Sequence, residues 1–397
     1  SHDRAAARVA LWLEEWREVW WTVPIWFGVL VALAVILRRI VREEPLISGS
    51  GIPQTELALA GRLSFTWWRV LLAKFLGSWL ALFGGLALGR EGPSIQMGGA
   101  VGAGFHALWR PAAPHALTGS PYVVAGAVAG LAAAFGAPAA GVLFAFEEMK
   151  SRRDTSLIVA ACASAIGAHL MIRIVFGMGR ILPFAGFEAP PLSSFWIVAL
   201  EGAVFGVLGV GYNKTLLWLH DREAGQTLIP DRWRALPPLL LAGCLALFAP
   251  LLIGGGESLI IFVGEHDVAL KTLILLLAFK YLFAQYSTVA SIPGGLLMPI
   301  LCLGALWGRL WAELPVSALA AHGLASGSVQ PYVLFGMVSY FAATVRAPLT
   351  GIVLVTEMSG TYTCLPGSLL AGLIACKVAN LLHCPPVYDS LKERIRL

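Results

Sequence analysis

Charged residues are scarce in this sequence. Asp, Glu, Lys and Arg make up 13% of the 397 residues, and hydrophobic residues make up 58%. Soluble domains average about 25% charged residues, so a soluble enzyme domain is excluded. Segments without these four residue types are long enough for membrane helices of about 20 residues, and they lie at 111–146, 155–172, 235–256, 281–308 and 314–345. The composition predicts a polytopic, all-α membrane protein.

Common catalytic and metal-binding motifs are also missing. The cysteines are scattered without a C-x-x-C pair, and the histidines show no metal spacing; H-E-x-x-H, P-loop and G-x-S-x-G motifs do not occur. We therefore expect no cofactor and no enzyme activity. The alternative from another functional class is an intramembrane Ser/His protease. His383 lies in the kind of place that such an enzyme requires, but no serine nucleophile motif accompanies it. The cysteines are expected to be reduced, buried apolar residues: Cys162, Cys244, Cys302, Cys364, Cys376 and Cys384.

Basic residues form three clusters, at 37–42, 150–153 and 392–396, within a net charge of +5. Such clusters mark cytoplasmic ends of membrane helices, although each can also be an ordinary helix-end charge. No basic patch carries interleaved exposed aromatic residues, so nucleic-acid binding is not expected.

The apolar runs and their breakers predict the helices. Residues 1–20 are expected to be an interfacial segment or a helix end, residues 48–60 a turn leading into a short helix, and residues 254–267 a polar loop. The run 111–146 exceeds one crossing, so Gly136 and Pro138 are expected to break it. The remaining helices are predicted at 22–40, 66–88, 93–108, 155–176, 193–219, 235–253, 269–287, from Pro299, and at 331–344, 348–357 and 366–383.

The stretch Gly89-Arg90-Glu91-Gly92-Pro93 places a charged pair between apolar runs. Proline is favoured at the first position of a helix, so Pro93 is predicted to open one, with Glu91 just ahead of it. Free N–H groups and the helix dipole make such a place an anion site. A solute anion and the Glu91 carboxylate then compete for it, which suggests a gate. The alternative is that Glu91 is a structural cap.

An internal repeat divides the chain. Gly89, Pro93, Gly98 and Gly102 match Gly295, Pro299, Gly304 and Gly308 at one constant spacing, and Ala137-Pro138 with Glu147 matches Ala347-Pro348 with Glu357. We predict two transmembrane halves, 1–185 and 186–397, with no cytosolic regulatory domain. Because the first residue is serine, the N-terminal part is expected to be truncated.

Three Gly-rich elbows, at 49–53, 89–93 and 294–299, each precede a proline-started apolar helix. Interrupted hydrophobic segments at matching places in two halves are typical of transporters, with the substrate site between the halves. Backbone N–H dipoles bind an anion without holding it too tightly for release. The expected substrate is therefore an anion.

At these motifs the sequence resembles the CLC chloride channel/transporter family, in particular its prokaryotic Cl−/H+ antiporters. The resemblance rests on Gly49-Ser50-Gly51-Ile52-Pro53, Gly89-Arg90-Glu91-Gly92-Pro93, Gly294-Gly295-Leu296-Leu297-Met298-Pro299 and Tyr388, in the family's order. It implies two inverted-topology repeats with broken and re-entrant helices. It also implies a homodimer with one pathway per subunit, in the cell (inner) membrane of a prokaryote.

The resemblance also implies roles for individual residues. Glu91 is the expected external gating glutamate, and Ser50 and Tyr388 are expected to bind the central anion through their hydroxyls. Ser50 can alternatively be a helix cap and Tyr388 an interfacial anchor, and Lys74 and Arg90 either supply positive field or anchor helix ends. The expected chloride-binding residues are Ser50, Gly51, Ile52, Arg90, Gly92, Leu296, Leu297 and Tyr388.

Glu148 matches the internal proton-accepting glutamate of the family's coupled members, and Glu147 is expected to assist it; an ordinary solvated cap is the alternative for both. The resemblance thus implies a secondary-active chloride/proton antiporter, with a passive chloride channel as the rival. Leu297 replaces a frequent phenylalanine, which affects the expected gating rate. Ser50, where a proline would favour nitrate, argues for chloride, and together with Tyr388 it argues against the fluoride-type branch.

Overall fold

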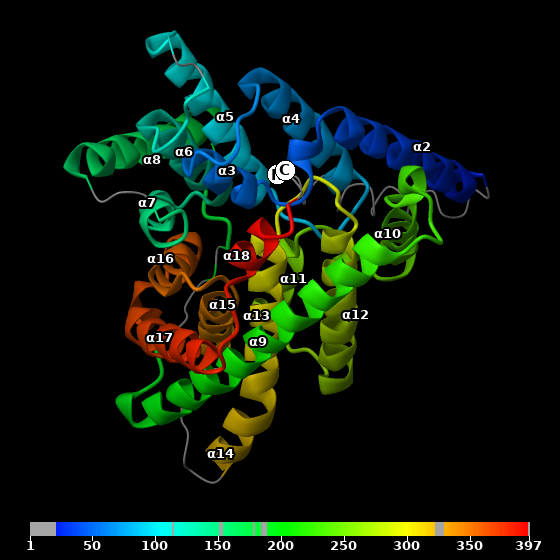
Figure 1. Ribbon diagram of the computed structural model, residues 1–397. Helices are drawn as coiled ribbons and strands as arrows, with labels where there is room; N and C mark the ends of the chain where they lie inside the picture. Colours follow the sequence, from blue (N-terminus) through cyan, green and yellow to red (C-terminus); the bar gives the residue numbers. More distant parts are fainter. Residues whose placement is uncertain are drawn as a thin grey trace.

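The computed structural model describes residues 21–112, 115–150, 154–177, 179–182, 184, 189–321 and 329–395. The expectation for residues 1–20 lies outside these ranges. Within them the chain is helical (Figure 1). The helices are α2 (Thr22–Glu43), α3 (Ile52–Leu59), α4 (Trp67–Phe83), α5 (Glu91–Trp109), α6 (Pro121–Phe135), α7 (Pro138–Glu147), α8 (Thr155–Phe176), α9 (Phe195–Gly225), α10 (Leu236–Phe248), α11 (Glu257–Glu265), α12 (Leu270–Val289), α13 (Leu297–Trp311), α14 (Ser317–Ala321), α15 (Gln330–Val345), α16 (Pro348–Ser359), α17 (Leu365–Leu381) and α18 (Val387–Lys392).

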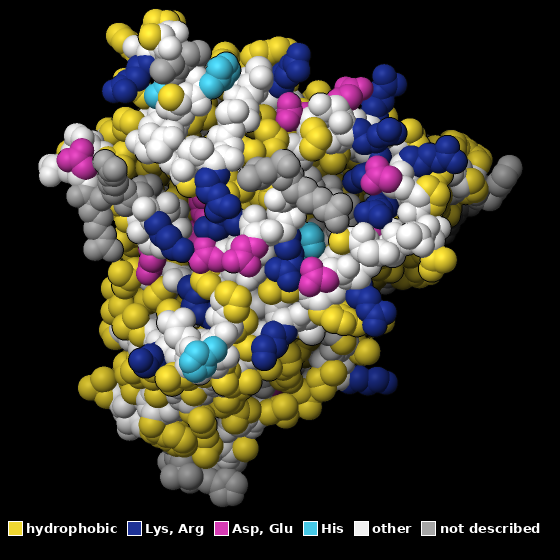
Figure 2. Space-filling view, in the orientation of Figure 1, with side chains coloured by type: hydrophobic (Ala, Val, Ile, Leu, Met, Phe, Trp, Pro, Cys, Tyr) yellow, Lys and Arg dark blue, Asp and Glu magenta, His cyan; other side chains and the backbone are white. Residues whose placement is uncertain are grey.

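Six helical stretches of the described chain are long and apolar enough to cross a membrane. The apolar run after residue 111 is broken as predicted, because α6 ends at Gly136, whose φ of 63° is left-handed, and α7 starts at Pro138. Large hydrophobic side chains such as Phe75 and Ile174 are exposed on the outer surfaces of α4 and α8. Figure 2 shows charged side chains gathered over the middle of one face and hydrophobic side chains covering its lower margin. These features fit an integral membrane protein.

Five details differ from the sequence predictions. α5 begins at Glu91, so this residue lies in the first helical turn and not ahead of it. α13 begins at Leu297 and not at Pro299. The expected polar loop at 254–267 is wrong because it contains α11, whose apolar centre is masked in the sequence by glutamates at both ends. The expectation of six buried cysteines is wrong for Cys244, which is exposed, and for Cys162 and Cys376, which are half-buried, because these three lie on helix faces that the protein does not cover. The end of the described chain forms α18, which packs against α3, α9 and α15.

The repeated glycines allow two equivalent helix pairs to pack closely. In the first half, a Cβ atom on Gly98 would lie 2.1 Å from the carbonyl oxygen of Gly126, so only glycine fits between α5 and α6. In the second half, a Cβ atom on Gly304 would lie 2.6 Å from the carbonyl oxygen of Gly336, between α13 and α15. Small residues let helix backbones approach in membranes. The repeat detected in the sequence therefore reflects the same packing in both inverted halves.

Glu147 and Glu357 join the halves by capping each other's helices. Glu147 ends α7 and accepts hydrogen bonds from Leu349 N (3.1 Å) and Thr350 N (2.7 Å) at the start of α16. Glu357 lies near the end of α16 and accepts bonds from Ala139 N (3.1 Å) and Ala140 N (2.9 Å) at the start of α7. The two helices lie next to each other in Figure 1. Each carboxylate satisfies N–H groups that have no partner inside the helix and complements the helix dipole.

This reciprocal capping gives a stability prediction. Replacing Glu357 by alanine leaves two N–H groups of α7 without their carboxylate, which costs about 1–2 kcal/mol. We expect a lower thermal midpoint in detergent micelles than for wild type. The control is Glu43→Ala, because Glu43 is exposed and forms only an i,i+4 pair with Arg39, worth less than about 0.5 kcal/mol. Equal midpoints for the two variants would contradict the capping role.

Candidate anion and proton site

The first elbow is held in shape by a buried lysine. Gly49 (φ 65°) and Gly51 (φ 93°) adopt left-handed backbone conformations immediately before α3. Lys74, fully buried in α4, donates hydrogen bonds to Ile47 O (2.8 Å) and Gly49 O (2.7 Å). A buried lysine needs such partners. The ammonium group of Lys74 therefore binds the elbow carbonyls and fixes the elbow in place. Any effect of its positive charge on an anion depends on that position.

The three predicted elbows meet at one place. Gly89 N donates to Gly295 O and Gly295 N donates to Gly89 O, both at 2.6 Å, which forms an antiparallel bridge between the halves. Gly294 N donates to Gly49 O at 3.0 Å, which ties in the first elbow. Segments that lie more than two hundred residues apart thus share a single backbone cluster. The structure confirms that the repeated elbows converge.

Glycine is required for this convergence. A Cβ atom on Gly92 would lie 2.2 Å from Ser50 Oγ and 2.7 Å from Ser50 O. A Cβ atom on Gly295 would lie 2.9 Å from Gly92 N. The starts of three helices, α3, α5 and α13, are brought together because Gly92 and Gly295 carry no side chain at these contacts.

Glu91 lies inside this cluster and is 2% exposed. A Cβ atom on Gly89 would lie 2.0 Å from Glu91 Oε2, so the carboxylate packs directly against the elbow backbone. Its neighbour Arg90 points away, because Arg90 Nε donates to Ala134 O at 3.2 Å and its guanidinium pairs with Glu257 at 3.8 Å. The carboxylate and the elbow N–H groups therefore share one small volume.

The other predicted anion-binding residues surround the same elbows. Gly51 and Leu296 precede α3 and α13, and Ile52 and Leu297 are the first residues of those helices. Ser50 and Tyr388 are buried, and their side chains interact with each other electrostatically. Within the described ranges, neither hydroxyl oxygen makes a hydrogen bond of normal geometry. Two buried hydroxyls with donor capacity, beside helix N-termini, suit a monovalent anion.

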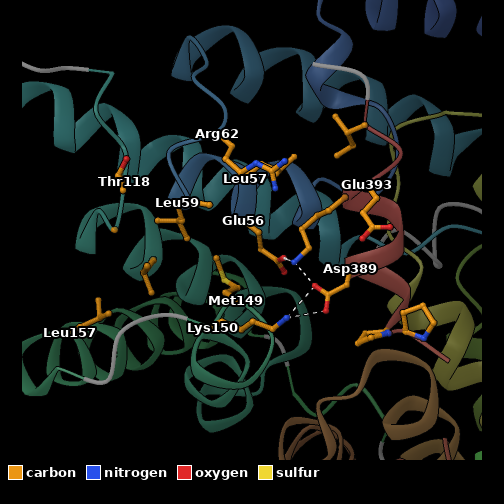
Figure 3. A pocket seen from close by; sticks show the side chains of 17 residues that line it. Glu56, Leu57, Leu59, Arg62, Thr118, Met149, Lys150, Leu157, Asp389 and Glu393 are labelled. Atoms are coloured by element: carbon orange, nitrogen blue, oxygen red, sulfur yellow. Dashed lines mark hydrogen bonds and ion pairs between the residues drawn. The ribbon is translucent and has the colours of Figure 1, made fainter. Parts of the chain in front are cut away.

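Glu148 lies at the C-terminal end of α7 and is 4% exposed. The next two residues, Met149 and Lys150, line a cavity of about 950 Å³ (Figure 3). Figure 3 shows Glu56, Asp389 and Lys150 pointing toward one another at its wall. Glu148 therefore lies next to a wide approach whose wall carries charged side chains.

An ion-pair network lines this approach, and the sequence reading did not anticipate it. Lys150 Nζ lies 2.9 Å from Asp389, and Lys392 Nζ lies 2.5 Å from both Asp389 and Glu56. Burial alone raises the pKa of Asp389, but hydrogen bonds from Lys392 and Lys150 outweigh burial and hold that pKa below its usual value. Asp389 thus stays ionised near neutral pH and fixes α18, which carries Tyr388, to the end of α7.

A second cavity, of about 400 Å³, approaches the elbows from the other side of α18. Gly49, Ser50 and Leu296 lie at its inner end, and Arg234 and Arg394 line it further out. Asp389 and Lys392 face the first cavity, whereas Leu391 and Arg394 face the second. Two approaches, one beside Glu148 and one to Ser50, thus flank a single short helix, and Ile395 lines both of them.

The structure also contains a fourth elbow, which sequence reading missed. Gly254 (φ 70°) and Gly256 (φ 104°) precede α11, and the fully buried Lys280 donates to Leu252 O (2.9 Å) and Gly254 O (2.7 Å). This repeats the arrangement of Lys74 around Gly49. The sequence does contain a pattern that indicates this fourth elbow. Each lysine follows its acceptor glycine at nearly the same separation, 25 and 26 residues.

Comparisons with known proteins agree with this geometry. The family model described as voltage gated chloride channel matches residues 27–380. The chain belongs to this family, the CLC family. The H(+)/Cl(-) exchange transporter ClcA of Vibrio campbellii is 36% identical over 394 residues, which cover 96% of this chain and 82% of that relative.

Solved CLC structures share the fold. A slow cyanobacterial Cl−/H+ antiporter superposes with a TM-score of 0.90 at 29% identity, covering 99% of this chain and 93% of that one. A eukaryotic CLC transporter superposes with a TM-score of 0.78 at 23% identity, covering 99% and 70%. The all-α CLC architecture of inverted repeats with broken and re-entrant helices is therefore established for this chain.

Close packing at the elbows gives a prediction for glycine substitutions. Gly92→Ala would force its methyl group into Ser50, so the elbows must separate. We expect at least a tenfold loss of chloride affinity, about 1.4 kcal/mol, in calorimetric titration of purified protein. Gly211→Ala is the control, because a methyl group there meets nothing within 4 Å. Unchanged affinity in Gly92→Ala would show that the tight convergence is not needed for binding.

Proposed function

We propose that this protein is a secondary-active chloride/proton antiporter. The observation that carries the proposal is the burial of the Glu91 carboxylate against the bridged elbows of both halves. An anion and this carboxylate require the same N–H groups. An ionised Glu91 therefore occupies the anion's place, and a protonated Glu91 has no charge to hold it there.

The residues assigned from sequence take the following roles in this proposal. Ser50 and Tyr388 donate their hydroxyls to chloride, and the backbone around Gly51, Ile52, Gly92, Leu296 and Leu297 supplies N–H dipoles. Arg90 contributes positive field at the outer side of the elbow. Lys74 and Arg90 direct their charged groups to backbone carbonyls and to Glu257, so in this proposal backbone dipoles and hydroxyls hold the anion and binding stays reversible.

Glu148 supplies the second half of the coupling. A carboxylate buried beside a polar cavity can take protons from the cytoplasmic solution and pass them toward Glu91, while chloride reaches Ser50 through the other cavity. The two approaches lie on different sides of α18, so each ion has its own route inward. Glu147 acts on this route by fixing the end of α7 through its bonds to α16.

Exchange is favoured over a passive channel. Proton transfer needs a titratable group on the inner side, and the buried Glu148 provides one. The relative from Vibrio campbellii is named an exchange transporter, and the cyanobacterial structure is that of an antiporter. A channel has no need for a second buried carboxylate.

We further propose the assembly and location. Residues 1–185 and 186–397 form the two halves of one pathway, and two copies form a homodimer in the inner membrane of a prokaryote. Lys150 and Lys392 both line the larger cavity, and basic residues favour the cytoplasmic side. We infer that this cavity opens to the cytoplasm, and that the second cavity, on the other side of α18, does so too.

Glu91→Gln is expected to separate chloride movement from proton movement. The amide cannot carry a proton, and without a charge it does not compete with the anion. Chloride efflux from proteoliposomes should continue, and proton movement in the same vesicles should fall to the protein-free background. Coupled proton movement that persists in this variant would rule out Glu91 as the gate.

Glu148→Gln is expected to stop proton transport while chloride transport continues, because only the inner proton acceptor is lost. Paired recordings of pH and chloride in proteoliposomes test this. The control is Glu393→Gln, since Glu393 lines the same cavity but is exposed. If proton transport is unchanged in Glu148→Gln, Glu148 is a structural cap.

A further inference from the structure

The fourth elbow faces Glu91 from the side opposite to Ser50. A small cavity is lined by Gly89, Arg90 and Glu91 from the first half and by Gly255, Glu257 and Met298 from the second. The cavity that Ser50 lines and the cavity beside Glu148 do not include these residues. Because the repeats are inverted, the elbow of the second half opens toward the membrane face opposite to that of the first.

The repeat relation also shows what is different here. Gly254 and Gly256 with Lys280 match Gly49 and Gly51 with Lys74, so the first helical residue, Ile52, corresponds to Glu257. An apolar residue in the first half is thus an acid in the second. That acid opens α11, where a carboxylate complements the helix dipole.

Arg90 connects this acid to the gate. Its guanidinium lies 3.8 Å from Glu257, and both side chains are 17% exposed. Arg90 directly precedes Glu91, which is 2% exposed. Solvent therefore reaches Glu257 more readily than Glu91. The cavity that both carboxylates line measures about 10 Å³, roughly the space of one water molecule.

We propose that Glu257 is the outer proton-transfer residue, which exchanges protons between Glu91 and the external solution. This inference rests on the proposed function. In the outward direction, the Glu91 carboxylic acid gives its proton to a bridging water, and that water gives a proton to the Glu257 carboxylate. Glu91 is then ionised, Glu257 is neutral, and Glu257 releases its proton to the outer solution. Uptake follows the same steps in reverse.

Electrostatics favour such a shared proton. The total charge of Arg90, Glu91 and Glu257 is zero before and after the transfer, because one of the two carboxylates is always ionised and the other protonated. The transfer therefore brings no net charge into the buried site. When Glu257 becomes neutral, Arg90 loses its counter-charge and stabilises the newly ionised Glu91. The other ionisable groups against this turn are Lys280 and Cys302, which a Cβ atom on Gly256 would approach to 3.2 Å and 2.5 Å.

The test uses the full chain in proteoliposomes, with chloride and proton fluxes recorded together. Glu257→Gln keeps the shape but cannot carry a proton, so we expect coupled turnover to fall by about tenfold or more, as for a lost general acid–base group. Glu257→Asp keeps the titratable group and should recover part of the rate. Glu265→Gln is the matched control, because Glu265 is exposed at the other end of α11.

A structural role for Glu257 is separated by combining variants. Chloride flux in Glu91→Gln needs no protons, so adding Glu257→Gln to it should change nothing. A fall in chloride flux in that double variant would overturn the inference. So would a coupled turnover rate of Glu257→Gln equal to that of wild type, or equal to or higher than that of Glu257→Asp. Wild type in the same assay reports on the proposed function, because chloride flux without proton movement there would overturn both.

Discussion

Two hydrogen bonds between Gly89 and Gly295, one in each direction, hold the centre of this protein together. They join the halves where helices break, and they leave the N-terminal ends of α3, α5 and α13 turned toward a common volume. Irregular backbone is tolerated at membrane depth only where its polar groups are satisfied or line a cavity. Here the elbows satisfy one another, and the remaining N–H groups can bind an anion or a carboxylate.

The rest of the fold supports this arrangement with the same side-chain contacts in each half. Lys74 and Lys280 each donate hydrogen bonds to the carbonyls of an elbow, and Glu147 and Glu357 each cap a helix of the other half. Each device satisfies backbone groups that would otherwise be costly to bury. Because both halves use both devices and the caps cross between the halves, displacing one elbow disturbs the opposite half as well. A rigid frame around a mobile carboxylate is what a competition between Glu91 and an anion requires.

Much of this was predictable from sequence, for identifiable reasons. Long apolar runs and Gly/Pro breakers predicted α2, α6, α7 and α8, since composition alone decides whether a segment crosses a membrane. The glycine repeat predicted the convergence of the elbows because close backbone packing admits no other residue. The fourth elbow was missed because Glu257 and Glu265 give α11 a polar appearance. The network of Lys150, Asp389, Lys392 and Glu56 was also out of reach, since ion pairs between distant segments depend on tertiary contacts that have no local pattern.

The central claim is that one carboxylate and one anion compete for the same dipole-lined site, which couples two opposite fluxes. The most direct measurement uses purified wild-type protein in liposomes with an imposed chloride gradient, the membrane potential clamped near zero by a potassium ionophore, and the external pH recorded. The account predicts uphill proton movement, driven by the chloride gradient and opposite in direction to the coupled chloride flux. Chloride movement with no accompanying change in external pH would contradict it.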